Sequence, residues 1–228
     1  MIWAIVPAKM LEQAKTRLAQ ALSPEERRSL SLAMLRDVLS ALRGAEHLDG
    51  VAVVTADVAL AAVATELGAK IIPEQTTGQN TALEAGVDYA RAQGATEVLI
   101  VSADLPRLCS ATIEQLLAQA RQHEQNRLVL LAPSHEGTGT NAMLQRPPGV
   151  IPLLFGVNSL QQHQQAAAER GTQVDLVQAD GLAFDVDLPA DLIDLLNRPC
   201  QTHTQAVLAE MRLPERLREP CYRATAVP

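Results

Sequence analysis

The sequence predicts an α/β fold with a mostly parallel, open sheet and helices on both faces of that sheet. Short apolar runs rich in Val, Ile and Leu alternate along the chain with longer stretches of helical periodicity. The 228 residues, 47% of them hydrophobic, suffice for one such domain. Because aromatic residues make up only 2%, we expect a core of Leu, Val, Ile and Ala.

The predicted strands are short apolar runs, as expected of strands that are buried on both faces. They lie at residues 2–6, 51–55, 69–73, 98–102 and 128–132. Residues 142–152 break the alternation with Pro147, Pro148 and Gly149, and we interpret them as a β-excursion inside the domain.

The predicted helices have recognisable starts and stops. Ser23 and Glu26 form a capping box with Pro24 at the first helical position, and Gly94 and Gly171 end two later helices. The helices are expected at 24–43, between 55 and Gly68, and at 80–93, 110–124, 159–170 and 189–197. Residues 1–197 thus form the predicted domain. Residues 198–228 have weak periodicity and are interpreted as a C-terminal extension.

Composition and charge exclude several classes of function. The net charge of −7 opposes binding along a nucleic-acid backbone, and 2% aromatic residues are too few for stacking on single strands. The N-terminal apolar run of five residues is shorter than a signal peptide or a membrane helix requires. Cys109, Cys200 and Cys221 are odd in number and lack zinc spacing. We expect a soluble, cytoplasmic protein with no nucleic-acid or membrane partner.

Three cations follow the first predicted strand, at the edge of the sheet where ligands of such folds bind. Lys9, Lys15 and Arg17 stand there without the glycines of a phosphate-binding loop. On composition alone, the favoured interpretation of Lys15 and Arg17 is that they are ordinary solvated cations. If the ligand is anionic, this basic loop or a metal must overcome the unfavourable net charge.

Carboxylates occupy the ends of other predicted strands. Asp57 follows the second strand, and Asp104 follows the strand at 98–102. Asp185 and Asp187 are two apart, so an extended backbone would direct both to one side. Three such carboxylates are ligands of the kind Mg²⁺ prefers. The alternatives are that Asp104 is a turn residue and that Asp187 caps the following helix.

Other segments are rich in groups that bind anions or bases. Thr140 and Asn141 end a run with two glycines, and Gly156 and Ser159 lie at the start of a predicted helix. The alternatives are that the first segment is a flexible hairpin loop and that the second is a plain helix cap.

A glycine and an amide enter the helix predicted at 80–93. Gly78 would permit close approach of the backbone to a flat ligand, and Asn80 could bind a base edge or simply begin the helix. His163, four residues beyond Ser159, either touches the site or packs.

With these residues assembled, the chain resembles the 2-phospho-L-lactate guanylyltransferases of deazaflavin coenzyme biosynthesis, a family that includes phosphoenolpyruvate and 3-phospho-D-glycerate guanylyltransferases. The matching segments occur in order and cover about residues 1–197. They are VPAK at 6–9, KTRL at 15–18, VVTAD at 53–57, GQNTALEAG at 78–86, SADLP at 102–106, APSHEGTGTNA at 132–142, FGVNSLQQH at 155–163 and FDVDLPADL at 184–192.

The resemblance implies a fold like that of nucleotide-diphospho-sugar transferases and a reaction. The phosphate of a small phosphorylated acid attacks the α-phosphorus of GTP and pyrophosphate leaves. A separate transferase then passes the phospho-acid portion of the product to the deazaflavin. Another nucleotidyltransferase, a glycosyltransferase of the same fold, or a non-catalytic nucleotide-binding domain remain the alternatives. A homodimer would be unremarkable for a chain of this length.

The resemblance also implies roles for the candidate residues. Asp104, Asp185 and Asp187 would hold Mg²⁺, and Lys15 and Arg17, with Lys9 behind them, would face the triphosphate. Asp57, Gly78 and Asn80 are the further candidates on the nucleotide side. The acid would be bound by Thr140, Asn141, Gly156 and Ser159.

Overall fold

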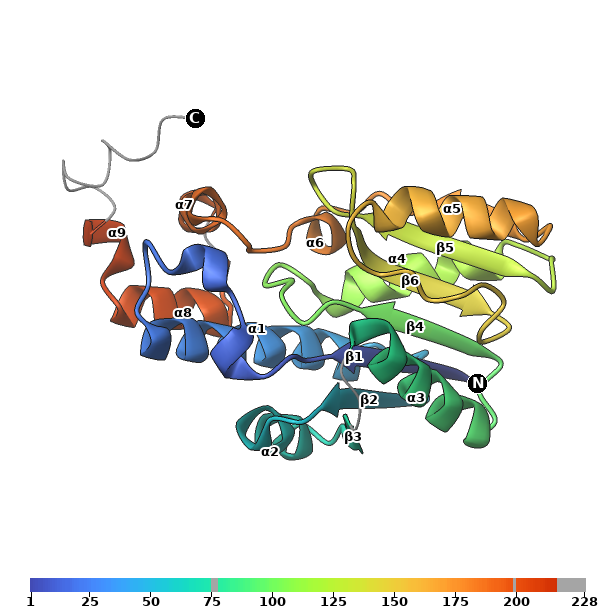
Figure 1. Cartoon of the computed structure of the whole chain (residues 1–228), viewed down its shortest axis with the longest axis horizontal. Coiled ribbons are helices and arrows are strands. Elements are labelled where there is room, and N and C mark those ends of the chain that lie inside the picture. Colours follow the sequence, from blue (N-terminus) through green and yellow to red (C-terminus); the bar gives the residue numbers. More distant parts are fainter. Residues whose placement is uncertain (75–77, 199, 217–228) are drawn as a thin grey trace.

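One sheet organises the whole molecule (Figure 1). The computed structural model describes residues 1–74, 78–198 and 200–216, and within them seven strands follow the order β3-β2-β1-β4-β6-β5-β7. The strands are β1 (Ile2–Pro7), β2 (Gly50–Thr55), β3 (Lys70–Pro73), β4 (Glu97–Val101), β5 (Leu128–Pro133), β6 (Thr140–Arg146) and β7 (Gln173–Leu176).

The sheet is mostly parallel, as predicted. β1 pairs in parallel with β2 and β4, and β2 with β3, while β5 pairs in parallel with β7. Of the seven described strands, only β6 runs in the opposite direction, between β4 and β5. The β-excursion expected at 142–152 is therefore a reversed strand that begins at Thr140 and ends at Arg146. The edge strand β7 was not predicted, because four residues that alternate polar and apolar carry little signal.

Helices connect the strands close to the predicted positions. They are α1 (Pro24–Arg43), α2 (Val58–Glu66), α3 (Gln79–Ala92), α4 (Ser110–Arg121), α5 (Ser159–Glu169), α6 (Asp180–Ala183), α7 (Pro189–Asn197), α8 (His203–Glu210) and α9 (Leu213–Arg216). The capping box of α1 is present: the Ser23 hydroxyl accepts from Glu26 N, and the Glu26 carboxylate accepts from Ser23 N.

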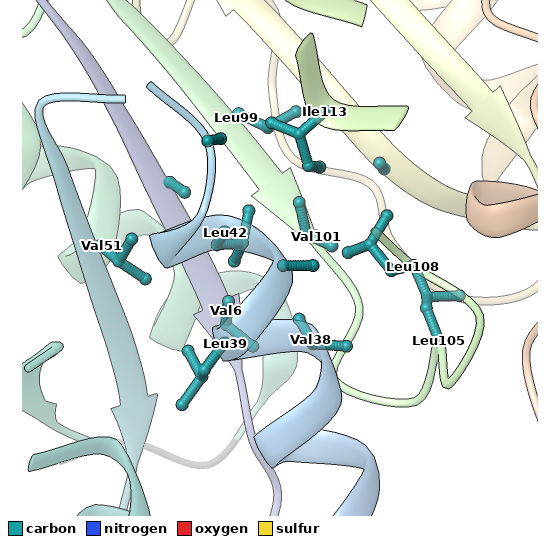
Figure 2. Close-up of a cluster of buried hydrophobic side chains, with 14 of the residues drawn as sticks. Val6, Val38, Leu39, Leu42, Val51, Leu99, Val101, Leu105, Leu108 and Ile113 are labelled. Carbon is teal, nitrogen blue, oxygen red and sulfur yellow. The ribbon is translucent and has the colours of Figure 1, made fainter. Parts of the chain in front are cut away.

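Alternate residues of the central strands pack against different helices. Ala4 and Val6 of β1 join a core with α1, α2 and α4, part of which Figure 2 shows. Trp3 and Ile5 face α3 and α5 on the other side of the sheet. Gly86 lets α3 approach closely, because a Cβ there would lie 2.6 Å from Ile5 Cγ2. Both faces are thus covered, which leaves the carboxyl ends of the strands as the open edge.

The C-terminal extension packs against the domain as far as it is described. α8 lies alongside α1 (Figure 1), and the buried Asp37 carboxylate accepts hydrogen bonds from His203 N at 2.7 Å and Thr204 N at 2.9 Å. Leu208 and Leu213 join a third cluster that also contains Leu18. The part of the extension from residue 217 onward, including Cys221, lies outside the described residues.

In the described part of the chain, no helix is both long enough and apolar enough to cross a membrane.

Candidate active site

Two adjoining cavities lie at the carboxyl ends of the strands. The larger, of about 330 Å³, is lined by the end of β1, the basic loop after it and Asp104. The smaller, of about 170 Å³, is lined by Thr140, Gly156 and Ser159. Both are lined by Gln79, Ser102, Asn141, Asp185 and Asp187. The molecule therefore offers two binding spaces that meet at the Asp185–Asp187 pair.

Lys15 is the central cation of the larger cavity. Its backbone is left-handed, with φ 53° and ψ 37°, between the short 3₁₀ helices η1 (Leu11–Gln13) and η2 (Thr16–Leu18). This conformation costs about 1 kcal/mol for a non-glycine residue. The Nζ of Lys15 lies 2.5 Å from Asp104 Oδ2 and 2.8 Å from Asp187 Oδ1. Burial lowers the pKa of Lys15, but the two carboxylates outweigh burial and raise it above its ordinary value.

The other residues of the predicted basic loop are placed differently. Lys9 is exposed and lines the larger cavity. Arg17 is exposed as well, and its charge helps to lower the pKa of Asp187. Asp57 caps α2 through Oδ1, which accepts from Ala59 N at 2.8 Å, while its Oδ2 accepts from Leu11 N at 3.0 Å. Asp57 thus anchors the basic loop, and its contact with a nucleotide stays a prediction.

Asp185 and Asp187 point to the same side of their segment, as the spacing predicted. Both line the two cavities, whereas Val186 between them is fully buried in the third cluster. Val186 N also donates to the backbone carbonyl of Asp104, which ties this segment to the end of β4. All three predicted carboxylates therefore meet at one cleft.

The environments of these two carboxylates differ. Burial raises the pKa of Asp185, and the neighbouring charges of Asp104 and Asp187 raise it further. A hydrogen bond from Asn141 lowers the pKa but does not outweigh them. Burial would also raise the pKa of Asp187, but Lys15 and more distant cations lower it below its ordinary value. Among the described residues, no Lys or Arg lies within ion-pair distance of Asp185, whereas Lys15 contacts Asp187.

The donor chemistry of the cleft fits Mg²⁺, because carboxylate oxygens are the ligands that this ion prefers. In the described residues, however, no three His, Cys, Asp or Glu side chains are grouped so that they could hold a metal ion together. The ammonium of Lys15 lies between Asp104 and Asp187. An ion between those two carboxylates therefore requires the ammonium to move.

The predicted acid-binding residues come together around the smaller cavity. Thr140 and Asn141 begin β6, while Gly156 and Ser159 lie at the start of α5. The Asn141 amide donates to Asp185 Oδ1 and to Ala183 O, each at 3.0 Å. Asn141 therefore links the smaller cavity to the central carboxylates.

Comparison with known proteins identifies the family. The chain matches the family model described as "Guanylyl transferase CofC like" over residues 2–224. The chain belongs to this guanylyltransferase family. The match extends past residue 197, beyond the motifs recognised in the sequence, into the C-terminal extension.

Individual relatives agree with this assignment. The chain is 41% identical over 192 residues to the phosphoenolpyruvate guanylyltransferase of Sphaerobacter thermophilus, covering 84% of this chain and 91% of the relative. It is 36% identical over 210 residues to the 2-phospho-L-lactate guanylyltransferase of Methanothermobacter thermautotrophicus, covering 92% and 90%. The predicted family and enzyme class are confirmed.

A solved structure confirms the predicted fold class. A protein of Desulfovibrio desulfuricans G20, described as a nucleotide-diphospho-sugar transferase, has a TM-score of 0.75 and 18% identity, covering 94% of this chain and 97% of the other. At this identity the comparison shows a shared fold.

One nucleotide-side candidate of the guanylyltransferase is held by contacts with the backbone. Asn80 Oδ1 accepts from Phe155 N at 2.9 Å, and its Nδ2 donates to Phe155 O at 3.1 Å. Asn80 thus holds the segment that precedes Gly156. Gly78 is exposed, with φ 129°, just before α3. Contact of either residue with a base stays a prediction.

Sequence reasoning did not single out several residues in or beside this guanylyltransferase site. His135 Nδ1 lies 3.3 Å from Asp185 Oδ1. Arg107 stacks on Phe184 at 3.7 Å from the ring centroid, and it donates to Asp194 of α7. Gln79 lines both cavities. The position of Arg107 directly after SADLP was an available signal, whereas the contact of His135 depends on the fold.

Proposed function

We propose that this guanylyltransferase joins the GMP moiety of GTP to a small phosphorylated acid, with release of pyrophosphate, in deazaflavin coenzyme biosynthesis. The acid is 2-phospho-L-lactate, phosphoenolpyruvate or 3-phospho-D-glycerate. The observation that carries the proposal is the pair of adjoining cavities that share Asp185 and Asp187. A reaction between two phosphates needs two such spaces and a polar junction at which the reacting atoms meet.

The larger cavity suits the nucleotide. Lys9 and Lys15 line it and supply positive charge to a triphosphate, with Arg17 on the same loop. The smaller cavity suits the acid, because Thr140, Ser159 and the backbone near Gly156 offer hydrogen-bond donors.

The proposed reaction requires little covalent chemistry from the side chains of the protein. An oxygen of the acid's phosphate attacks the α-phosphorus of GTP, the bond to the β-phosphate oxygen breaks, and pyrophosphate leaves. A phosphate monoester is already a nucleophile, so the side chains align two anions and offset their charge. Lys15 would stabilise charge on the departing pyrophosphate, and Asn141 would keep Asp185 oriented at the junction.

We propose Mg²⁺ as the cofactor, held by Asp104, Asp185 and Asp187. Two observations support it: all three side chains are carboxylates, and all three line the larger cavity. Binding by all three requires the ammonium of Lys15 to leave its place between Asp104 and Asp187. When bound, the ion supplies charge neutralisation at the phosphates. We also propose a cytoplasmic location, a separate downstream deazaflavin transferase as partner, and a homodimer as an assembly to be tested.

The test is pyrophosphate release with Mg²⁺, in wells that pair GTP, ATP, CTP or UTP with each of the three acids. The downstream transferase and deazaflavin acceptor are included to trap the product. We expect pyrophosphate release only in wells that contain GTP, and with only one of the three acids. Release with another nucleotide would point to a different nucleotidyltransferase, and silence in every well would point to a binding domain.

A variant pair checks that the release comes from this site. We expect Asp185→Asn to lose at least about 100-fold in kcat while its circular dichroism spectrum stays unchanged. Asp88→Asn is the matched control, because Asp88 is an exposed residue of α3 outside both cavities. Equal loss in both variants would contradict the assignment.

A further inference from the structure

His163 is a fully buried residue of α5 that makes two hydrogen bonds. Its Nε2 accepts from the backbone N–H of Leu154, with the two nitrogens 3.0 Å apart. Its Nδ1 lies 3.1 Å from the hydroxyl oxygen of Thr140. The ring thus connects the segment before Gly156 with a side chain that lines the smaller cavity.

These two contacts determine where the ring carries its hydrogen. A backbone N–H can only donate, so Nε2 must be the unprotonated acceptor. A neutral imidazole then has its hydrogen on Nδ1, which donates to Thr140 Oγ1. Burial lowers the pKa of His163 to about 4, so the ring is neutral near pH 7.

The tautomer of His163 in turn directs the hydroxyl of Thr140. Because Oγ1 accepts from the ring, its own hydrogen must be donated elsewhere. Throughout the described residues, Oγ1 has no hydrogen-bond partner other than His163. Thr140 is only 6% exposed, and it lines the smaller cavity beside Ser159 and Gly156. The hydrogen is therefore available to an acceptor in that cavity.

We propose that His163 is a positioning residue that makes Thr140 an obligatory hydrogen-bond donor to an anionic oxygen of the acid substrate. The inference rests on the proposed function, to which it adds a cause for anion selectivity in the smaller cavity. A hydroxyl that is free to rotate can accept as well as donate, whereas one that already accepts from His163 presents its hydrogen. A phosphate or carboxylate oxygen matches it, and a hydrogen-bond donor does not.

Two substitutions separate the two bonds of the ring. The terminal amide of Asn lies near the place of Nδ1, so His163→Asn can still donate to Thr140 but loses Leu154. The amide of Gln reaches the place of Nε2, so His163→Gln can still accept from Leu154 but loses Thr140. We expect His163→Gln to raise the KM for the acid about tenfold or more, and His163→Asn to raise it clearly less. The KM for GTP should change little in either.

A double-mutant cycle tests whether His163 acts through Thr140. Thr140→Val removes the donor and should raise the KM for the acid about as much as His163→Gln does. The double variant Thr140→Val, His163→Gln should then show no further increase. Additive effects, or equal loss in His163→Asn and His163→Gln, would mean that the ring acts only by packing and would overturn the proposal.

One measurement is independent of turnover. In the ¹⁵N-histidine spectrum of the wild-type protein, His163 should show the tautomer with hydrogen on Nδ1, and added phosphoenolpyruvate should shift its signals. The tautomer with hydrogen on Nε2 would overturn the inference even in an active enzyme. If the Nδ1 tautomer is found but no acid is turned over, the proposed function fails and the geometry of Thr140 stands.

Discussion

Lys15 and Asp104 lie 89 residues apart in the chain, yet Nζ of Lys15 is 2.5 Å from Oδ2 of Asp104. The contact joins the loop after β1 to the end of β4, two strands that are neighbours in the sheet. It places an ammonium group beside Asp187, which lines both cavities, without any glycine-rich loop. The left-handed backbone of Lys15 is the local cost of that placement.

Replacing Lys15 by Met should remove catalysis while preserving the fold. We expect a loss of at least about 100-fold in kcat/KM, because in the proposed reaction Lys15 stabilises charge on the departing pyrophosphate. Because the ammonium no longer lies between Asp104 and Asp187, the variant should also bind Mg²⁺ more tightly by calorimetry. Lys70→Met, at an exposed position of β3, is the control that should stay near wild type. Equal activity in both variants would contradict a role for Lys15.

The anchor of the C-terminal extension should contribute measurably to stability. Asp37 is 7% exposed and accepts from two backbone amides and the Thr204 hydroxyl. In Asp37→Asn an NH₂ group replaces one acceptor oxygen and faces a hydrogen-bond donor. We therefore expect a loss of about 2–4 kcal/mol in the free energy of unfolding. Urea denaturation measures it. Asp88→Asn, at the surface, should lose less than about 0.5 kcal/mol.

The substitution Asp37→Asn should also weaken nucleotide binding. Leu208 of α8 packs in the third cluster with Leu18 and Leu22, which follow Lys15 in the chain. Release of α8 would loosen the support of the basic loop, so the KM for GTP should rise severalfold at a temperature where the variant is folded. An unchanged KM would show that the loop holds its shape without the extension.

The sequence indicated those parts of the site that depend on local pattern. Asp185 and Asp187 share a face because period two is a property of any extended segment. The insertion of Lys15 between two carboxylates was not predictable, because its partners Asp104 and Asp187 are 89 and 172 residues away. Asp57 and Asn80 look alike as candidates, and only tertiary contacts show that their side chains hold backbone amides.

Gly86 should not tolerate a methyl group. In an exposed helix, Gly→Ala stabilises by about 1 kcal/mol. At Gly86, however, the new Cβ would lie 2.6 Å from Ile5 Cγ2 and 3.0 Å from Val54 Cγ2. We expect Gly86→Ala to lower the free energy of unfolding by about 1–3 kcal/mol. Ala85→Ser, at the exposed neighbouring position, should cost less, and a more stable Gly86→Ala variant would show that α3 can shift away from the sheet.

His163 should make the protein less stable as the pH falls through a defined window. Its pKa is about 4 in the folded state, against an ordinary value of 6.5. Between these values the unfolded chain binds a proton that the folded protein does not, so stability falls as the pH decreases from 6.5 to about 4. The loss is at most about 3 kcal/mol. Urea unfolding of wild type and His163→Gln at several pH values isolates this residue, because the other groups titrate in both. The stability difference between the two proteins should shrink as the pH falls, and a constant difference would contradict the prediction.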